Sequence, residues 1–194
     1  MHIKDSSDKN FPYLFFVKFL GCFFILYCFF PFYRGLTAAG GKVFSPFLYS
    51  HFNIIKVFTL FLTNSSELLL EALHYEVLQT NYHTLRISHS RAVSVNPSCL
   101  GWAVMSFWVA FVFANKAPVK HKLIWIITGI ISICIINITR ISLIALSSHL
   151  HWKTFVSLDH HLLFNICSYL CVFLLMYMYI RAQKNYDEPK KKAF

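Results

Sequence analysis

Charged side chains are scarce in this chain of 194 residues: Asp, Glu, Lys and Arg together make up 13% of it. A soluble domain of this size has about 25%. Hydrophobic residues make up 57% and gather in long runs, which a soluble core does not require. The length fits about four to six spans of about 20 residues, without a second soluble domain. We therefore predict an all-α polytopic membrane protein whose residues 1–194 form a single membrane domain.

Acidic residues are especially few, with 8 Asp and Glu against 18 Lys and Arg, a net charge of +10. In a soluble protein this excess would suggest a nucleic-acid partner. Here the basic residues stand mostly between or after the apolar runs, where they keep loops in the cytoplasm. The charge therefore indicates how the chain lies in a bilayer, and no nucleic-acid partner is expected.

Spacings typical of disulfide frameworks and metal sites are missing. The six cysteines form no CxxC pair and no Cys/His zinc pattern, and five of them lie inside apolar runs. The ten histidines include no HExxH and no helical HxxxH. We expect no metal and no other cofactor, although His151 and His160 are possible ligands in a loop.

The apolar runs predict about five transmembrane helices. The second run is the weakest, since it contains Pro46, His51, Asn53 and Lys56, and it is either a span or a helix lying partly in the interface. The first run is too long for the core of a signal peptide and no typical cleavage site follows it, so it should stay in the mature protein. The five predicted spans cover residues 11–33, 43–62, 99–115, 123–149 and 161–180.

Between the second and third spans, residues 63–98 form a polar loop. The Asn-Ser-Ser-Glu sequence at residues 64–67 resembles a helix start. Further on, apolar and polar residues alternate, which predicts a small β-hairpin outside the membrane. The alternating apolar residues are Leu85, Ile87, Val93 and Val95.

Basic residues also predict the orientation. Five of them lie in the tail, residues 181–194, and three in the loop at residues 116–122, so both segments should be cytoplasmic. Residues 63–98 and 150–160 then lie outside the cytoplasm. If residues 43–62 cross, the linker at residues 34–42 is inside and the N-terminus is outside. The expected location is the cytoplasmic (inner) membrane of the cell.

This orientation places Cys99 at the outer start of the third span. Asn96 can cap the helix and Pro97 suits its first position, which would put Cys99 in the first turn. There the unpaired N–H groups and the helix dipole favour a thiolate. The alternative is a cysteine that only packs at a helix end.

Arg140 places a positive charge inside an apolar run. Inserting an Arg at the centre of a membrane helix costs about 2.5–3.5 kcal/mol on insertion scales. The predicted span enters from the cytoplasmic side at Leu123, and Arg140 lies about 25 Å further along the helix. The hydrocarbon core is about 30 Å thick, so Arg140 should lie near the outer interface. Asn137, one turn earlier, shares its face and can orient the guanidinium. The alternative is an arginine whose side chain reaches up to the interface.

The last predicted span begins beside two histidines at the same outer face. Asp159 precedes His160 and His161, and it can orient an imidazole. Adjacent helical residues point about 100° apart, so only one of the two histidines can face Cys99 and Arg140. Asn165, one turn after His161, could support His161 instead of His160.

Three short motifs together resemble those of the exosortases and archaeosortases. They are Asn-Pro-Ser-Cys-Leu-Gly at residues 96–101, Asn-Ile-Thr-Arg at 137–140 and Asp-His-His-Leu-Leu-Phe-Asn at 159–165. The order Cys, Arg, His fits that family, and the likeness covers residues 43–180. In the family the Cys is usually followed by Ser-Gly, whereas Leu100 follows Cys99 here.

The resemblance implies a membrane-embedded cysteine protease or transpeptidase. Its substrates would be exported, membrane-anchored proteins whose C-terminal signal has a recognition motif, a transmembrane helix and a basic cluster. Cys99 would form a thioester with the substrate, Arg140 would stabilise the thiolate or the oxyanion, and a histidine would transfer protons. The family's spacing favours His160 over His161, with Asn137, Asp159 and Asn165 as supporting residues.

Two other classes of function stay open at this point. One is a small transporter or assembly subunit without enzymatic activity, in which Arg140 is a structural or gating charge. The other is a membrane acyl or glycosyl transferase that uses a histidine at the outer face.

Overall fold

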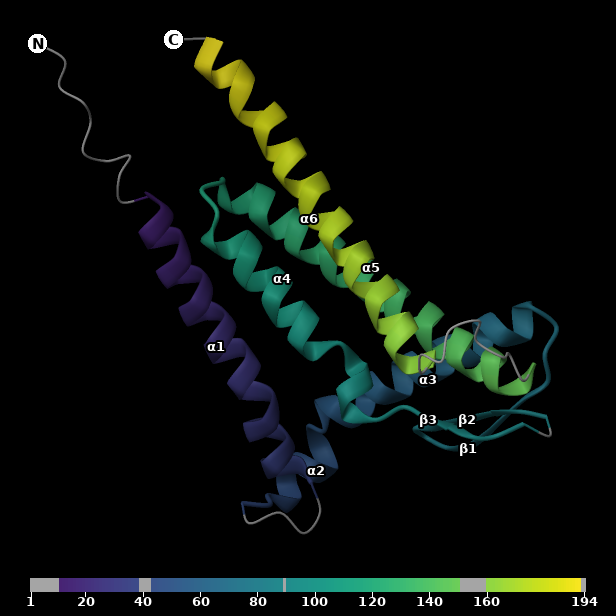
Figure 1. The fold of residues 1–194 in the computed structure, drawn as a ribbon. Coiled ribbons are helices and arrows are strands. Elements are labelled where there is room, and N and C mark those ends of the chain that lie inside the picture. The colour runs from purple at the N-terminus through teal and green to yellow at the C-terminus, as the bar shows by residue number, and fades with distance from the viewer. Residues whose placement is uncertain (1–10, 39–42, 89, 151–159, 193–194) are drawn as a thin grey trace, which may run out of the picture.

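The computed structural model describes residues 11–38, 43–88, 90–150 and 160–192 (Figure 1). These residues are mostly helical, with one small sheet. In chain order the elements are α1 (Phe11–Thr37), α2 (Pro46–His51), α3 (Ile54–Ala72), β1 (Val77–Asn81), β2 (Thr84–Ile87), β3 (Val93–Ser94), the 3-10 turn η1 (Pro97–Leu100), α4 (Trp102–Ala114), α5 (Val119–His149) and α6 (His160–Lys192).

In the described part of the chain, three helices are long and apolar enough to cross a membrane. The apolar stretches are Tyr13–Thr37 in α1, all of α5, and Asn165–Tyr186 in α6. Helix α4 is apolar too, but it has only 13 residues. These features agree with the predicted class, a helical membrane protein.

Helices α1 and α4 pack against each other in opposite directions. Near the start of α1, the ring of Phe15 meets Phe111 edge to face, 6.3 Å between centroids. Toward its end, the carbonyl of Leu26 accepts a 2.9 Å hydrogen bond from Trp102 Nε1. The beginning of α1 therefore lies beside the end of α4.

The bundle consequently has two distinct ends (Figure 1). At the tail end lie the start of α1, the loop between α4 and α5, and the last turns of α6, where the Gln183 amide donates to the Lys116 carbonyl. At the sheet end lie α2, the three strands and η1. The end of α1 is thus at the sheet end with Cys99, whereas the sequence placed the linker at residues 34–42 at the opposite end if residues 43–62 cross the membrane.

The cause of this difference is that residues 43–62 do not form one helix. Helix α2 ends at His51, and α3 begins after Asn53, whose side chain accepts a 3.0 Å hydrogen bond from the backbone N–H of Lys56. Helix α3 then continues to Ala72, ten residues beyond the predicted end. Proline and a capping Asn are both typical of helix starts. Two separate helices, α2 and α3, therefore begin within the predicted span.

The predicted helix start at residues 64–67 is wrong, because these residues lie inside α3. Ser66 satisfies its hydroxyl by donating to the Leu62 carbonyl one turn earlier, at 2.8 Å. The Ser142 hydroxyl of α5 in turn donates to the Ser66 carbonyl at 3.3 Å. Both serines are buried, so the polar residues that resembled a cap hold α3 against α5.

The three strands form one antiparallel sheet in the order β1-β2-β3. Val77 pairs with Ile87, and Leu85 pairs with Val93. One face of the sheet contributes buried side chains to two apolar clusters with α3, η1 and α5. The buried residues of these clusters are Leu62, Leu70, Leu85, Ile87, Val95, Leu100, Ile141 and Ala145. The sheet thereby fixes η1 against the end of α5.

A glycine sets the spacing between α4 and α5. Trp108 of α4 is fully buried, and its Nε1 donates to the Trp125 carbonyl of α5 at 3.1 Å. An added Cβ at Gly129 would lie 1.8 Å from that same nitrogen. The indole therefore occupies the space that any larger residue at position 129 would need.

Gly129→Ala should accordingly destabilise the protein by about 1–3 kcal/mol, as overpacking of a filled core does. Helix propensity alone favours Ala over Gly by about 1 kcal/mol, so a loss of stability isolates the packing effect. Thermal unfolding of the purified protein in detergent measures it. Gly21→Ala is the matched control, because nothing lies within 4 Å of its Cβ. Equal unfolding temperatures for both variants would contradict this account of the interface.

Candidate active site

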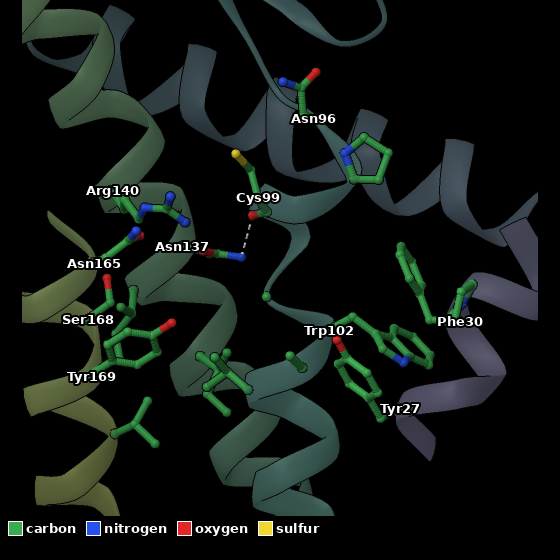
Figure 2. A pocket seen from close by; sticks show the side chains of 18 residues that line it. Tyr27, Phe30, Asn96, Cys99, Trp102, Asn137, Arg140, Asn165, Ser168 and Tyr169 are labelled. Carbon is green, nitrogen blue, oxygen red and sulfur yellow. Dashed lines mark hydrogen bonds between the residues drawn. The ribbon is translucent and has the colours of Figure 1, made fainter. Parts of the chain in front are cut away.

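A cavity of about 570 Å³ opens near the sheet end of the bundle, among α1, η1, α4, α5 and α6 (Figure 2). Apolar side chains make up much of its wall. Its polar lining residues come from four segments that are far apart in the sequence: Tyr27, Asn96, Cys99, Asn137, Arg140, Asn165, Ser168 and Tyr169. The cavity thus brings together residues of all three motifs: Cys99 of the first, Arg140 of the second and Asn165 of the third.

Cys99 sits in η1, not in the first turn of α4 as the sequence predicted. Its backbone N–H donates to the Asn96 carbonyl at 2.7 Å, and Gly101, with a φ of 71°, separates this turn from α4. The side chain of Asn96 makes no capping hydrogen bond. Left-handed backbone at Gly101 ends the 3-10 turn, because this conformation is available to glycine at little cost.

The neighbour of Cys99 holds this turn in place. Leu100 is 1% exposed and packs with Leu62, Leu85, Val95 and Ile141. An apolar side chain at position 100 therefore anchors η1 to the sheet and to α5, while Cys99 itself remains half-buried at the cavity wall.

Asn137 joins α5 to the cysteine turn. Its amide Nδ2 donates a 2.9 Å hydrogen bond to the Cys99 carbonyl (Figure 2), and the residue is 5% exposed. A Cβ on Gly101 would lie 2.7 Å from the same Nδ2. The sequence predicted that Asn137 would orient Arg140, whereas its amide instead positions the backbone of Cys99.

Arg140 lies one turn beyond Asn137 on α5 and points into the cavity on the side of Cys99 (Figure 2). Its Nε is buried and has no hydrogen-bond partner among the described residues. No acidic side chain of the described residues pairs with it either. A guanidinium with an unused donor at a cavity wall is suited to hold a carbonyl oxygen or an anion.

Helix α6 supplies the wall opposite η1. Asn165, Ser168, Tyr169 and Val172 line the cavity, and their spacing of three and four residues marks one face of the helix. Helix α6 begins at His160, but the side chains of His160 and His161 lie outside the described part of the chain, as does all of Asp159.

Comparisons of the chain with protein-family models, with curated proteins and with solved structures give no significant match. Its chemistry must therefore be inferred from the cavity. The other five cysteines do not line it: Cys22 and Cys28 belong to α1, Cys134 to α5, and Cys167 and Cys171 to α6.

Several cavity residues were missed by the sequence interpretation. Ser168 and Tyr169 follow Asn165 by one helical turn, so the spacing from Asn165 could have indicated them. Tyr27 and Trp102 gave no such signal, since aromatic residues are frequent throughout the apolar runs. Their place depends on how α1 packs against α4.

Proposed function

We propose that this protein is a membrane-embedded cysteine peptidase or transpeptidase that acts in the manner of the exosortases and archaeosortases. Its substrates would be exported, membrane-anchored proteins, cleaved near a C-terminal apolar helix. The observation that carries the proposal is that Cys99 and Arg140, from separate elements, line one cavity, and that Arg140 Nε has no hydrogen-bond partner among the described residues. The test is to replace Cys99 in the native gene and to compare the C-termini of exported membrane proteins by mass spectrometry.

In this mechanism the Cys99 thiolate attacks the carbonyl carbon of the scissile peptide bond. A bond from Sγ to that carbon forms, and Arg140 stabilises the resulting oxyanion. The C–N bond then breaks, and a histidine gives its proton to the leaving amine. The remaining thioester is attacked by water or by an amine, whose proton returns to the histidine as the thiolate leaves.

Helix lengths support a reaction close to the membrane surface. The 13 residues of α4 span about 20 Å, against about 30 Å for the hydrocarbon core. If Ala114 lies near the cytoplasmic surface, the cavity at the other end of α4 is sunk below the outer surface. A peptide bond next to a substrate's transmembrane helix lies at that depth.

We further propose four crossings, by α1, α4, α5 and α6, with α3 and the sheet outside the cytoplasm. The basic tail supports a cytoplasmic position for the tail end of the bundle. A reporter that is active only outside the cytoplasm should then give no signal when fused after Gln183 and a strong signal at Ser90. At Val43 it should also be active, because four crossings put this position outside and five would put it inside. Activity at Gln183 would contradict the orientation.

The cavity-lining face of α6 also bears on the choice of histidine. Asn165, Ser168, Tyr169 and Val172 recur every three or four residues, and one further turn back along the same face is position 161. Position 160 is about 100° away from it. The phase of the helix thus favours His161 over His160, although motif spacing favours His160.

His161→Ala should therefore lower the rate of substrate cleavage by several orders of magnitude, since each proton transfer contributes about 10²–10⁴-fold. His160→Ala should cost little. Both variants are compared at matched expression by the fraction of uncleaved C-termini. Loss of cleavage in His160→Ala alone would make His160 the proton donor in the same mechanism. Normal cleavage in both variants would mean that neither histidine takes part.

A further inference from the structure

A second polar cavity, of about 360 Å³, lies beside the candidate active site. Its walls come from the end of α1, from α2 and α3, from the turn between β1 and β2, and from the segment after β3. Asn96 and Pro97 line both cavities, so only the segment that leads into η1 separates them.

The lining of this second cavity is basic. Arg34 at the end of α1, Lys56 in the first turn of α3 and His83 in the β1–β2 turn all contribute to it, and no acidic residue does. Hydroxyl and amide donors from Tyr49 and Asn53 add to the wall. Helix α1, helix α3 and the β1–β2 turn thus each contribute a cationic or ionisable side chain to the wall of this cavity.

These charges are not compensated within the described part of the chain. No acidic side chain there pairs with Arg34 or Lys56. Lys56 Nζ instead lies 5.6 Å from the ring centroid of Tyr82, a weak cation–π contact. His83 Nδ1 is buried and has no hydrogen-bond partner among the described residues. An anion bound in this cavity would therefore meet two cations that no acidic side chain of the described residues compensates.

We propose that this cavity, which we call the anion cavity, binds a phosphate group. A guanidinium fork, an ammonium and neutral donors that approach from different elements suit the oxygens of a tetrahedral anion. The phosphate can belong to a phospholipid headgroup or be free in solution. The site does not depend on the chemistry of Cys99, so it can be tested in Cys99→Ala protein as well as in the native protein.

The experiment uses the full-length protein in an uncharged, phosphate-free detergent and isothermal titration calorimetry. The probes are inorganic phosphate, dihexanoyl phosphatidylglycerol and, as the uncharged control, dihexanoylglycerol. A Glu-rich peptide tests a carboxylate ligand. Lys56→Gln and Arg34→Gln remove one cation each. Arg86→Gln is the matched control, because Arg86 is an exposed basic residue of β2 that does not line the cavity.

We expect the phosphate-bearing probe to bind and dihexanoylglycerol not to bind. Affinity should fall about tenfold to a hundredfold in Arg34→Gln and Lys56→Gln, as for loss of one charge-assisted hydrogen bond, and should stay unchanged in Arg86→Gln. Tighter binding of the phospholipid than of phosphate would identify a lipid headgroup, and equal binding would identify free phosphate.

Other outcomes overturn the proposal. Binding of the Glu-rich peptide alone would mean that the cavity recognises carboxylates. Phosphate binding that is equal in native protein and in Lys56→Gln would place the site elsewhere. Because Arg34 and Lys56 are both exposed, both variants should fold. Absence of binding by either phosphate probe would refute the site.

Discussion

Cys99→Ala is expected to abolish cleavage of the substrate's C-terminal signal while the protein remains inserted and abundant. The reason is that Cys99 is the one cysteine of the chain that lines the cavity with Arg140. Without the sulfur no thioester forms, and no other side chain described at the cavity wall supplies a thiolate. The measurement is the fraction of uncleaved C-termini among exported membrane proteins, at matched levels of the variant and the native protein.

The matched control replaces the other five cysteines together while Cys99 is kept. Cys134 packs against the apolar core formed by α4, α5 and α6, so the slightly larger Val keeps this position filled, and Ala is suitable at the more open positions. This variant should cleave normally. An inactive control combined with an active Cys99→Ala would show that the nucleophile has been assigned to the wrong residue.

Arg140→Lys should fail nearly as badly as Arg140→Ala, with a loss of about 10²–10³-fold in rate, the range for removing one oxyanion donor. Lysine keeps the positive charge but lacks the planar fork that can hold an oxygen with two parallel hydrogen bonds. Single-turnover cleavage at matched expression measures this effect.

Thr139→Ala is the control for Arg140→Lys, because Thr139 is an exposed neighbour on α5 that does not line the cavity. It should react at the native rate. Near-native cleavage by Arg140→Lys would mean that Arg140 contributes only charge, or only fixes the helix in the membrane.

Helices α1, α5 and α6 were predictable because each coincides with a long apolar run, which has few other stable forms in a membrane. Residues 43–62 were predicted as one span or as a helix partly in the interface, whereas the structure divides them between α2 and α3. Pro46 and Asn53 are local helix-start signals, and they outweigh the moderate hydrophobicity of the run. The extension of α3 to Ala72 places Ser66 and Leu70 in buried contacts with distant parts of the chain, which no local pattern reveals.

Part of the candidate site could be predicted in the same way. The basic tail and the order of the spans were enough to place Cys99 and Arg140 at the same end. The hydrogen bond from Asn137 to the Cys99 carbonyl was not predictable, because it depends on the left-handed Gly101 and on the close approach of η1 to α5. The anion cavity was missed because its basic residues are dispersed over three elements.

The most direct test of the central claim is to search for an acyl group on Cys99 itself. Membranes from cells that carry native protein or Arg140→Ala are digested, and the peptide containing Cys99 is analysed by mass spectrometry with and without neutral hydroxylamine. We predict a hydroxylamine-sensitive thioester to a peptide on Cys99 of the native protein, absent in Arg140→Ala. A free thiol in every sample, or a lipid acyl mass in place of a peptide, would contradict the proposed peptidase mechanism.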